Sequence, residues 1–241
     1  MTSDTGSVVT VTGRIDPDDL GVTLPHEHLF ADWSYRFDPP DSAAERRLAR
    51  EPISLETLGF VHRNKGSHED NLRLDSLEEA VDEVTAYRNA GGEAIVDVTP
   101  KNVGNDPVRS RAVAIETGVH VVQGTAYYNE RNSDLPERLR AAAIDDIADE
   151  FVDDVREGIG DTDVRAGIIG EIGLSDRIHE VEEKVLRAGA RAATRTGAAL
   201  TIHPPGATAF SQRDRTYPAS RWGLDILDVV EEEGLTPERV I

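Results

Sequence analysis

Cysteine is absent from the 241 residues, and lysine occurs only as Lys65, Lys101 and Lys184. Without cysteine the chain has no disulfides, thiolate ligands or cysteine nucleophiles, so histidines and carboxylates would have to hold any metal. No stretch approaches the roughly 20 apolar residues that span a bilayer. The N-terminus also lacks the basic and apolar regions of a secretion signal. The sequence therefore predicts a cytoplasmic protein with no membrane partner.

Charge of one sign dominates, with 46 acidic against 26 basic residues and a formal net charge of −20. Such a surface repels phosphates, which makes nucleic acid an unlikely class of partner. The acids could form an acidic functional surface. We favour general acidity suited to a high-salt cytoplasm, because the acids are spread along the chain and salt screens their mutual repulsion.

Apolar segments alternate with amphipathic ones, a pattern typical of parallel β/α units in a single domain spanning 1–241. A short N-terminal hairpin is predicted first. Strands are predicted at 21–28, 94–98, 119–125, 164–172 and 198–203, with another beginning at 239–241. Helices are predicted at 75–90, 107–117, 135–158, 179–196 and 219–233. The irregular segment 30–74, with short helices at 42–50 and 54–62, is either a substrate-contacting lid or a plain insertion.

Unusual polar residues stand at three of the predicted strand ends. His26 and His28 are two apart, so in a strand they point to the same face and form half of a zinc site. Glu171 and His203 end later strands, and the C-terminal strand ends of a parallel barrel share one face. Taken singly, His203 is typical of a core histidine and Glu171 of a cap or ion-pair partner. Taken together, the four residues favour a metal site, because a metal keeps a buried carboxylate ionised.

The remaining histidines carry no such signal. His62 and His68 fall in the irregular segment, His120 begins a strand, and His179 lies on an acidic helix. All four are expected at the surface.

Several segments, in this order along nearly the whole chain, resemble the phosphotriesterase family of the amidohydrolase superfamily, in particular its phosphotriesterase-related branch. They are Val9–Ile15, Leu20–Leu29, Val96–Pro100, Ile168–Gly173 and Ile202–His203. The resemblance implies a (β/α)8 barrel with two divalent metal ions of the zinc type that activate a bridging hydroxide. It implies that His26 and His28 ligate the more buried metal, that Glu171 is the catalytic bridging carboxylate, and that His203 ligates the more exposed metal. Tyr128, in the run 125–128, is a weaker candidate for a substrate contact.

The sequence departs from this pattern in two places. Asn105 stands where related sequences usually carry the arginine of a Gly-Arg-Asp motif. The family also carries a ligand histidine on its sixth strand and a proton-accepting aspartate on its eighth, and neither is found in these 241 residues. Five β/α units and the start of a sixth strand are present, so we expect an incomplete (β/α)8 TIM-barrel fold.

Two functions remain open. The first is a metal-dependent hydrolase that attacks a small-molecule lactone, ester, amide or phosphoester. The alternative is an inactive fragment that binds one metal weakly or assembles with another chain, including a second copy of itself. Metal stoichiometry distinguishes them, because the enzyme requires about two tightly held ions per chain.

Overall fold

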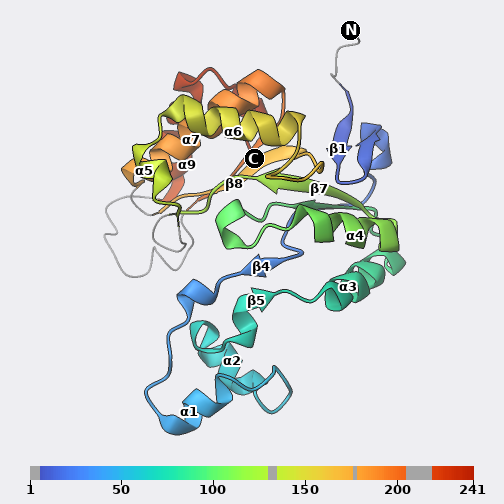
Figure 1. The fold of residues 1–241 in the computed structure, drawn as a ribbon, viewed down its shortest axis with the longest axis vertical. Helices are drawn as coiled ribbons and strands as arrows, with labels where there is room; N and C mark the ends of the chain where they lie inside the picture. Colours follow the sequence, from blue (N-terminus) through green and yellow to red (C-terminus); the bar gives the residue numbers. More distant parts are fainter. Residues whose placement is uncertain (1–5, 130–134, 176–177, 205–218) are drawn as a thin grey trace.

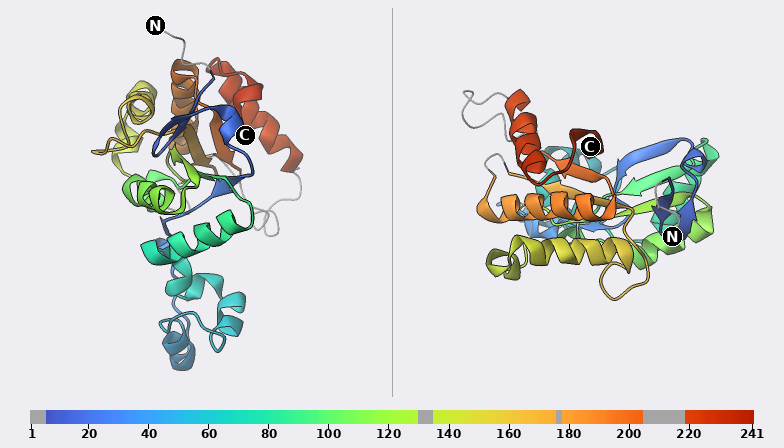
Figure 2. Two further views of the ribbon diagram at one scale, coloured as in Figure 1. Left: turned by 90° about the vertical axis from the view of Figure 1, so that its right-hand side faces the viewer. Right: turned by 90° about the horizontal axis from the view of Figure 1, so that it is seen from above.

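Five parallel strands form the centre of the protein. The computed structural model describes residues 6–129, 135–175, 178–204 and 219–241, with the backbone alone at 219–222. The strands lie in the order β3-β6-β7-β8-β9, and every neighbouring pair is parallel. Their bounds are Thr23–Glu27, Ala94–Asp97, His120–Thr125, Ile168–Gly173 and Leu200–His203. The predicted α/β fold is thereby confirmed, as a curled part of a (β/α) barrel with helices outside it (Figures 1 and 2).

The predicted hairpin is also present. Strands β1 (Val8–Thr10) and β2 (Gly13–Ile15) pair in antiparallel fashion, and the amide of Val11 donates to the carbonyl of Val121 at 2.9 Å. At the other end of the chain, Pro237–Arg239 forms a 3-10 turn rather than a strand. Only the last two residues pair with β9, where Val240 bridges Leu200 in parallel and the amide of Ile202 donates to Ile241.

The helices follow the predicted pattern because local capping and packing agree. Ser76 accepts a hydrogen bond from the Glu79 amide and starts α3, while Gly118 ends α4 at a φ of 70°, in the left-handed region that glycine tolerates. The main core lies where α6 and α7 cover β8 and β9, with Phe151 and Leu186 fully buried. The helix bounds are α3 Leu77–Asn89, α4 Pro107–Thr117, α6 Ile144–Arg156, α7 Glu180–Thr196 and α9 Ala219–Glu232.

The long helix predicted at 135–158 is wrong in one respect, because it is two helices. Helix α5 covers Arg138–Ala141, and α6 starts afresh after Ala143, which has extended backbone with a ψ of 157°. Asp146 accepts a hydrogen bond from the Ala143 amide at 3.1 Å, which satisfies a donor at the new N-terminus. Acidic side chains in this first turn also interact favourably with the helix dipole, so the chain restarts here.

The strand predicted at 164–172 starts later, at Ile168. The carbonyl of Val164 accepts from Ile159, and the amide of Ala166 donates to the carbonyl of Asp154. These backbone groups are bonded to the end of α6 and the turn after it, so they are not available to a neighbouring strand.

Segment 30–74 is a folded insertion that projects from the barrel (Figures 1 and 2). Its base is closed by β4 (Ala31–Asp32) and β5 (Arg73–Leu74), which pair in antiparallel fashion. Helix α1 (Ala43–Leu48) lies inside the predicted range, whereas α2 (Leu58–Arg63) begins four residues late. The delay has a local cause: residues 54–57 form a turn in which the amide of Ser54 donates to Thr57 Oγ1 at 2.8 Å.

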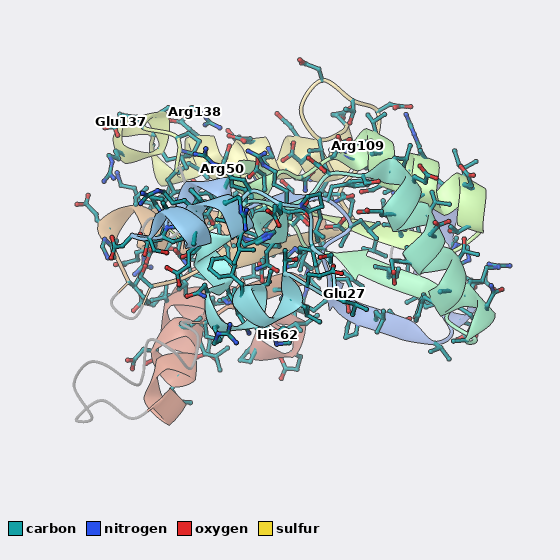
Figure 3. All side chains as sticks on the ribbon, turned by 90° about the horizontal axis from the view of Figure 1, so that it is seen from below. Glu27, Arg50, His62, Arg109, Glu137 and Arg138 are labelled. Carbon is teal, nitrogen blue, oxygen red and sulfur yellow. The ribbon has the colours of Figure 1, made fainter. Side chains whose placement is uncertain are left out.

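The prediction that His68 lies at the surface is wrong, and His120 is half-buried. His68 is fully buried in the insertion, with its ring 6.2 Å from that of Phe60. A chain that folds back on itself needs apolar contacts inside, and the imidazole ring of His68 provides part of them. His62, by contrast, is exposed on α2, and Figure 3 labels it in the view of the molecule from below. Among the described residues, no helix has the length and apolar character needed to cross a membrane.

Gly124 allows the three central strands to approach one another. A Cβ at this position would lie 2.3 Å from the carbonyl oxygen of Gly170 and 3.1 Å from that of Asp97. Both obstacles are main-chain atoms of neighbouring strands, which cannot rotate away as a side chain can. The position of Gly170 matters further because the next residue, Glu171, is one of the predicted site residues.

Gly124→Ala is expected to lower the free energy of unfolding by about 1–3 kcal/mol, the usual cost of overpacking. Gly223→Ala is the matched control. Gly223 is exposed on α9 with nothing within 4 Å of an added Cβ, so alanine should raise stability there by about 0.5–1 kcal/mol. Urea unfolding of both variants checks this. Stability of Gly124→Ala equal to that of the unchanged chain would contradict the close-approach argument.

Candidate metal centre

His26 and His28 lie at the C-terminal end of β3 and face the same carboxylate. The pairing of β3 with β6 is irregular between Leu24 and Glu27, at the point where the two histidines begin. His26 Nε2 lies 2.9 Å from Glu171 Oε2, and His28 Nε2 lies 3.7 Å from Glu171 Oε1. One ligand atom from each of these three residues falls within 4.8 Å of the other two. The structure therefore brings together three predicted site residues from two separate strands.

His203 joins the same group from β9. Its Nδ1 lies 2.8 Å from Glu171 Oε2, the oxygen that also faces His26. The rings of His26 and His203 are 6.3 Å apart. This arrangement follows from the topology, because β3, β8 and β9 are parallel members of one sheet and end at one edge.

Glu171 is buried, with 2% of its surface exposed, and it has no lysine or arginine partner in the described part of the chain. Three imidazoles surround it instead. A carboxylate buried in this way is expensive unless a positive charge compensates it. Imidazole nitrogens and a carboxylate are suitable donors for a zinc-type divalent ion, so the residues present fit such a group.

Contacts behind the ligands hold His28 in position. Thr99, just after β6, has its Oγ1 3.0 Å from His28 Nδ1, which leaves Nε2 facing Glu171. Asp97 accepts hydrogen bonds from the amides of Thr99 and Leu29, so one carboxylate joins both strand ends. Burial lowers the pKa of His28, against the attraction of Glu171 and Asp97, and it raises the pKa of Asp97. A lowered pKa favours the neutral imidazole, which is the form that binds metals.

Aromatic rings flank the cluster on two sides. Trp33, from the start of the insertion, meets His28 edge-on with ring centroids 5.4 Å apart. Tyr128 meets His203 in the same manner at 5.3 Å and is 8% exposed. Burial raises the pKa of Tyr128, so its hydroxyl stays protonated at neutral pH. Tyr128 thus lies beside His203, and its contact with substrate stays a prediction.

Sequence reasoning missed Asp97, Thr99 and Trp33. Asp97 and Thr99 could have been found, because they are polar residues at the end of the apolar strand 94–97. The two histidines were predicted as site residues from the same feature at the end of their own strand. Asn105, at the position where an arginine was expected, donates through Nδ2 to the carbonyls of Thr99 and Gly124 at 2.6 and 3.0 Å. It therefore braces the same strand ends from behind.

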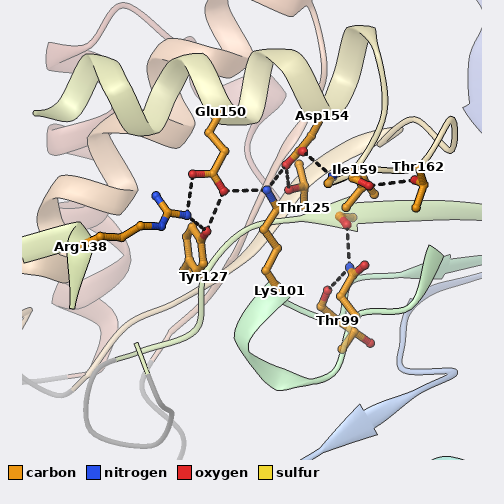
Figure 4. A network of polar contacts seen from close by, with 12 residues as sticks. Thr99, Lys101, Thr125, Tyr127, Arg138, Glu150, Asp154, Ile159 and Thr162 are labelled. Atoms are coloured by element: carbon orange, nitrogen blue, oxygen red, sulfur yellow. Dashed lines mark hydrogen bonds and ion pairs between the residues drawn. The ribbon is translucent and has the colours of Figure 1, made fainter. Parts of the chain in front are cut away.

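A second polar network lies beside the cluster and fastens α6 to the sheet (Figure 4). Lys101 forms ion pairs with Glu150 and with Asp154, and the hydroxyl of Tyr127 donates to Glu150 at 2.6 Å. Because its ammonium group is paired with two carboxylates, Lys101 is held in a structural role. It contributes no free charge to the candidate centre.

Comparison with known proteins shows relatives over almost the whole chain. The profile of the Phosphotriesterase family matches residues 6–241. The N-acetyltaurine hydrolase of Danio rerio is 37% identical over 95% of this chain and 62% of its own length, and that of Homo sapiens is 36% identical over 85% and 58%. This chain therefore spans about six-tenths of the length of these relatives.

Solved structures show the same fold. A resiniferatoxin-binding protein from Rhodobacter sphaeroides has a TM-score of 0.87 at 39% identity, over 98% of this chain and 62% of its own. A phosphotriesterase homology protein from Escherichia coli, complexed with phosphate in its active site, has a TM-score of 0.68 at 28% identity. That match covers 92% of this chain and 62% of the other.

In protein kept metal-free with a chelator, Glu171→Gln is expected to raise the free energy of unfolding by about 1 kcal/mol or more, because it removes a buried charge that has no cationic partner. Glu233→Gln is the control. Glu233 accepts from Arg187 at 2.9 Å and Arg191 at 2.6 Å, so the same substitution there should lower stability by about 1–2 kcal/mol. Denaturant unfolding at one pH measures both. Equal losses in the two variants would show that Glu171 is compensated within the metal-free protein.

Proposed function

The chain is a member of the phosphotriesterase family, and from that premise we propose that it forms the metal-binding part of a hydrolase of small amides. His26, His28, Glu171 and His203 would hold two divalent ions of the zinc type. The observation that carries this proposal is the buried carboxylate of Glu171, which three imidazoles face from two other strands and which no lysine or arginine of the described residues neutralises. When bound, such ions lower the pKa of a water molecule and polarise a carbonyl group.

The residues of the chain have distinct tasks in this proposal. Glu171 offers two oxygens, one toward His26 and His203 and the other toward His28, so one carboxylate can serve two ions. Thr99 Oγ1 fixes the ring orientation of His28. Tyr128, whose pKa is raised, keeps its hydroxyl proton and is available as a donor to a substrate oxygen. Trp33 and Tyr128 shield the cluster from water on two sides.

An amide is the substrate class that we favour. Both curated relatives above are N-acetyltaurine hydrolases, and their substrate is an acetyl amide of an aminoalkyl sulfonate. Lactones, esters and phosphoesters are the other candidates, because the same ion chemistry serves each of them. The second candidate function is a chain that binds one ion weakly and is inactive unless it assembles with another chain. His26 is 43% exposed in its side chain, which leaves the cluster open on that side.

The decisive experiment counts metal and product together. The chain is stripped with a chelator, reloaded with zinc, dialysed and analysed for bound metal, and taurine release from N-acetyltaurine is then measured. About two retained ions with zinc-dependent release support the hydrolase. One ion or none, without release, supports the inactive alternative. His26→Ala is expected to reduce both retained zinc and release, and His62→Ala, an exposed histidine of the insertion, should change neither.

Thr99→Val tests the orientation of His28. Valine keeps the shape of threonine and its backbone amide, which donates to Asp97, but it removes the oxygen 3.0 Å from His28 Nδ1. Loss of such a supporting contact typically weakens metal binding by about 10–100-fold. Competition with a chromogenic chelator measures the zinc affinity, and Thr196→Val, at the end of α7, is the matched control. Unchanged affinity in Thr99→Val would remove the assigned role of this hydroxyl.

A further inference from the structure

Arg36 lies next to the candidate centre but belongs to the insertion. It ends the short 3-10 turn Ser34–Arg36, which follows β4. Its guanidinium carbon is 5.7 Å from the ring centroid of Tyr128 and 5.7 Å from that of Tyr35. The Tyr128 ring in turn lies 5.3 Å from that of His203. One aromatic ring therefore separates this cation from a predicted metal ligand.

The turn that carries Arg36 is fixed at both ends. The amide of Trp33 donates to the carbonyl of Leu72 at 2.8 Å, across the base of the insertion, and the amide of Arg36 donates to the carbonyl of Trp33 at 2.8 Å. Trp33 also packs edge-on against His28. The guanidinium is thus placed by a turn bonded to the base of the insertion and by aromatic surfaces that favour a cation above them.

No carboxylate neutralises the charge of Arg36 among the described residues, although the chain carries 46 acidic residues. Arg187 shows the common arrangement in this molecule, since it contacts Glu183, Glu232 and Glu233, each at 2.9 Å. Arg36 is also exposed, at the edge of the candidate site.

We propose that Arg36 binds the anionic group, a sulfonate or a carboxylate, of a substrate whose amide lies at the candidate metal centre. The proposal rests on the proposed function and narrows its substrate class to N-acylated amino acids and amino sulfonates. A guanidinium presents parallel donors that match two oxygens of such a group. Tyr128, between Arg36 and His203, would line the part of the substrate that connects the anion to the amide. Lys101 cannot take this role, because Glu150 and Asp154 already occupy its ammonium group.

The test compares an anionic substrate with a neutral one. N-acetyltaurine and N-ethylacetamide carry the same acetyl amide, but only the first has a sulfonate. In Arg36→Gln the ratio of kcat/KM for the anionic over the neutral amide should fall about 10–100-fold, through KM, since a charge-assisted hydrogen bond is lost. Arg36→Lys keeps the positive charge but lacks the two parallel donors of a guanidinium, so the ratio should fall less in this variant. Arg63→Gln, which removes one positive charge from α2 of the same insertion, should leave the ratio unchanged.

Calorimetric binding of N-acetyltaurine separates this proposal from the proposed function. It is measured at one ionic strength with the chain as purified, so it needs no turnover. Weaker binding by Arg36→Gln than by Arg63→Gln supports the anion site even if no amide is hydrolysed. Equal binding by the two variants, or no binding by the unchanged chain, overturns it, whatever hydrolysis of N-ethylacetamide shows.

Discussion

The charge of Glu171 is the constraint on which the candidate centre depends. A carboxylate that is 2% exposed and has no lysine or arginine beside it among the described residues is tolerated only if something else compensates its charge. Three parallel strands end at one edge and place His26, His28 and His203 around the two carboxylate oxygens, as donors for a compensating ion. The glycine at position 124 matters for the same reason, because it allows the main chain just before Glu171 to approach the neighbouring strand. The close packing of the main chain at Gly124 therefore helps to determine the position of Glu171 in the candidate centre.

Much of this arrangement could be predicted because it depends on short sequence periods. Two histidines two residues apart share a face, and parallel strands in chain order bring their ends together, so the convergence of His26, His28, Glu171 and His203 was predictable. The break before α6 was not, because it depends on whether Asp146 caps a new helix or remains in the middle of a longer one. Burial of His68 was equally hidden. It arises from contacts within an insertion whose path the periodicity does not specify.

The basic residues discussed above fall into two groups, according to whether carboxylates or aromatic rings hold them. Lys101, Arg187 and Arg191 are each held by two or more carboxylates, and these contacts fasten helices to the sheet or to each other. A side-chain charge that carboxylates already neutralise attracts an anionic ligand only weakly. Arg36 belongs to the other group, since aromatic rings rather than acids position it. In a molecule with a net charge of −20, an anionic ligand is repelled over most of the surface. A local cation next to the centre therefore has more influence on selectivity than it would in a neutral protein.

In the proposed function, the insertion couples metal binding to the choice of substrate. Strand β3 ends in the two histidines, and the same backbone continues within a few residues to Trp33 and Arg36. Because Trp33 packs on His28 and Arg36 lies over Tyr128, a shift of the base of the insertion would move a candidate metal ligand and the proposed anion-binding group together. The antiparallel pair β4–β5 restrains that base. The outer part of the insertion, with α1 and α2, buries Phe60 and His68 among its own residues. On the proposed function, substitutions among the few residues between His28 and Arg36 would change the substrate range while the histidines and Glu171 stay in place.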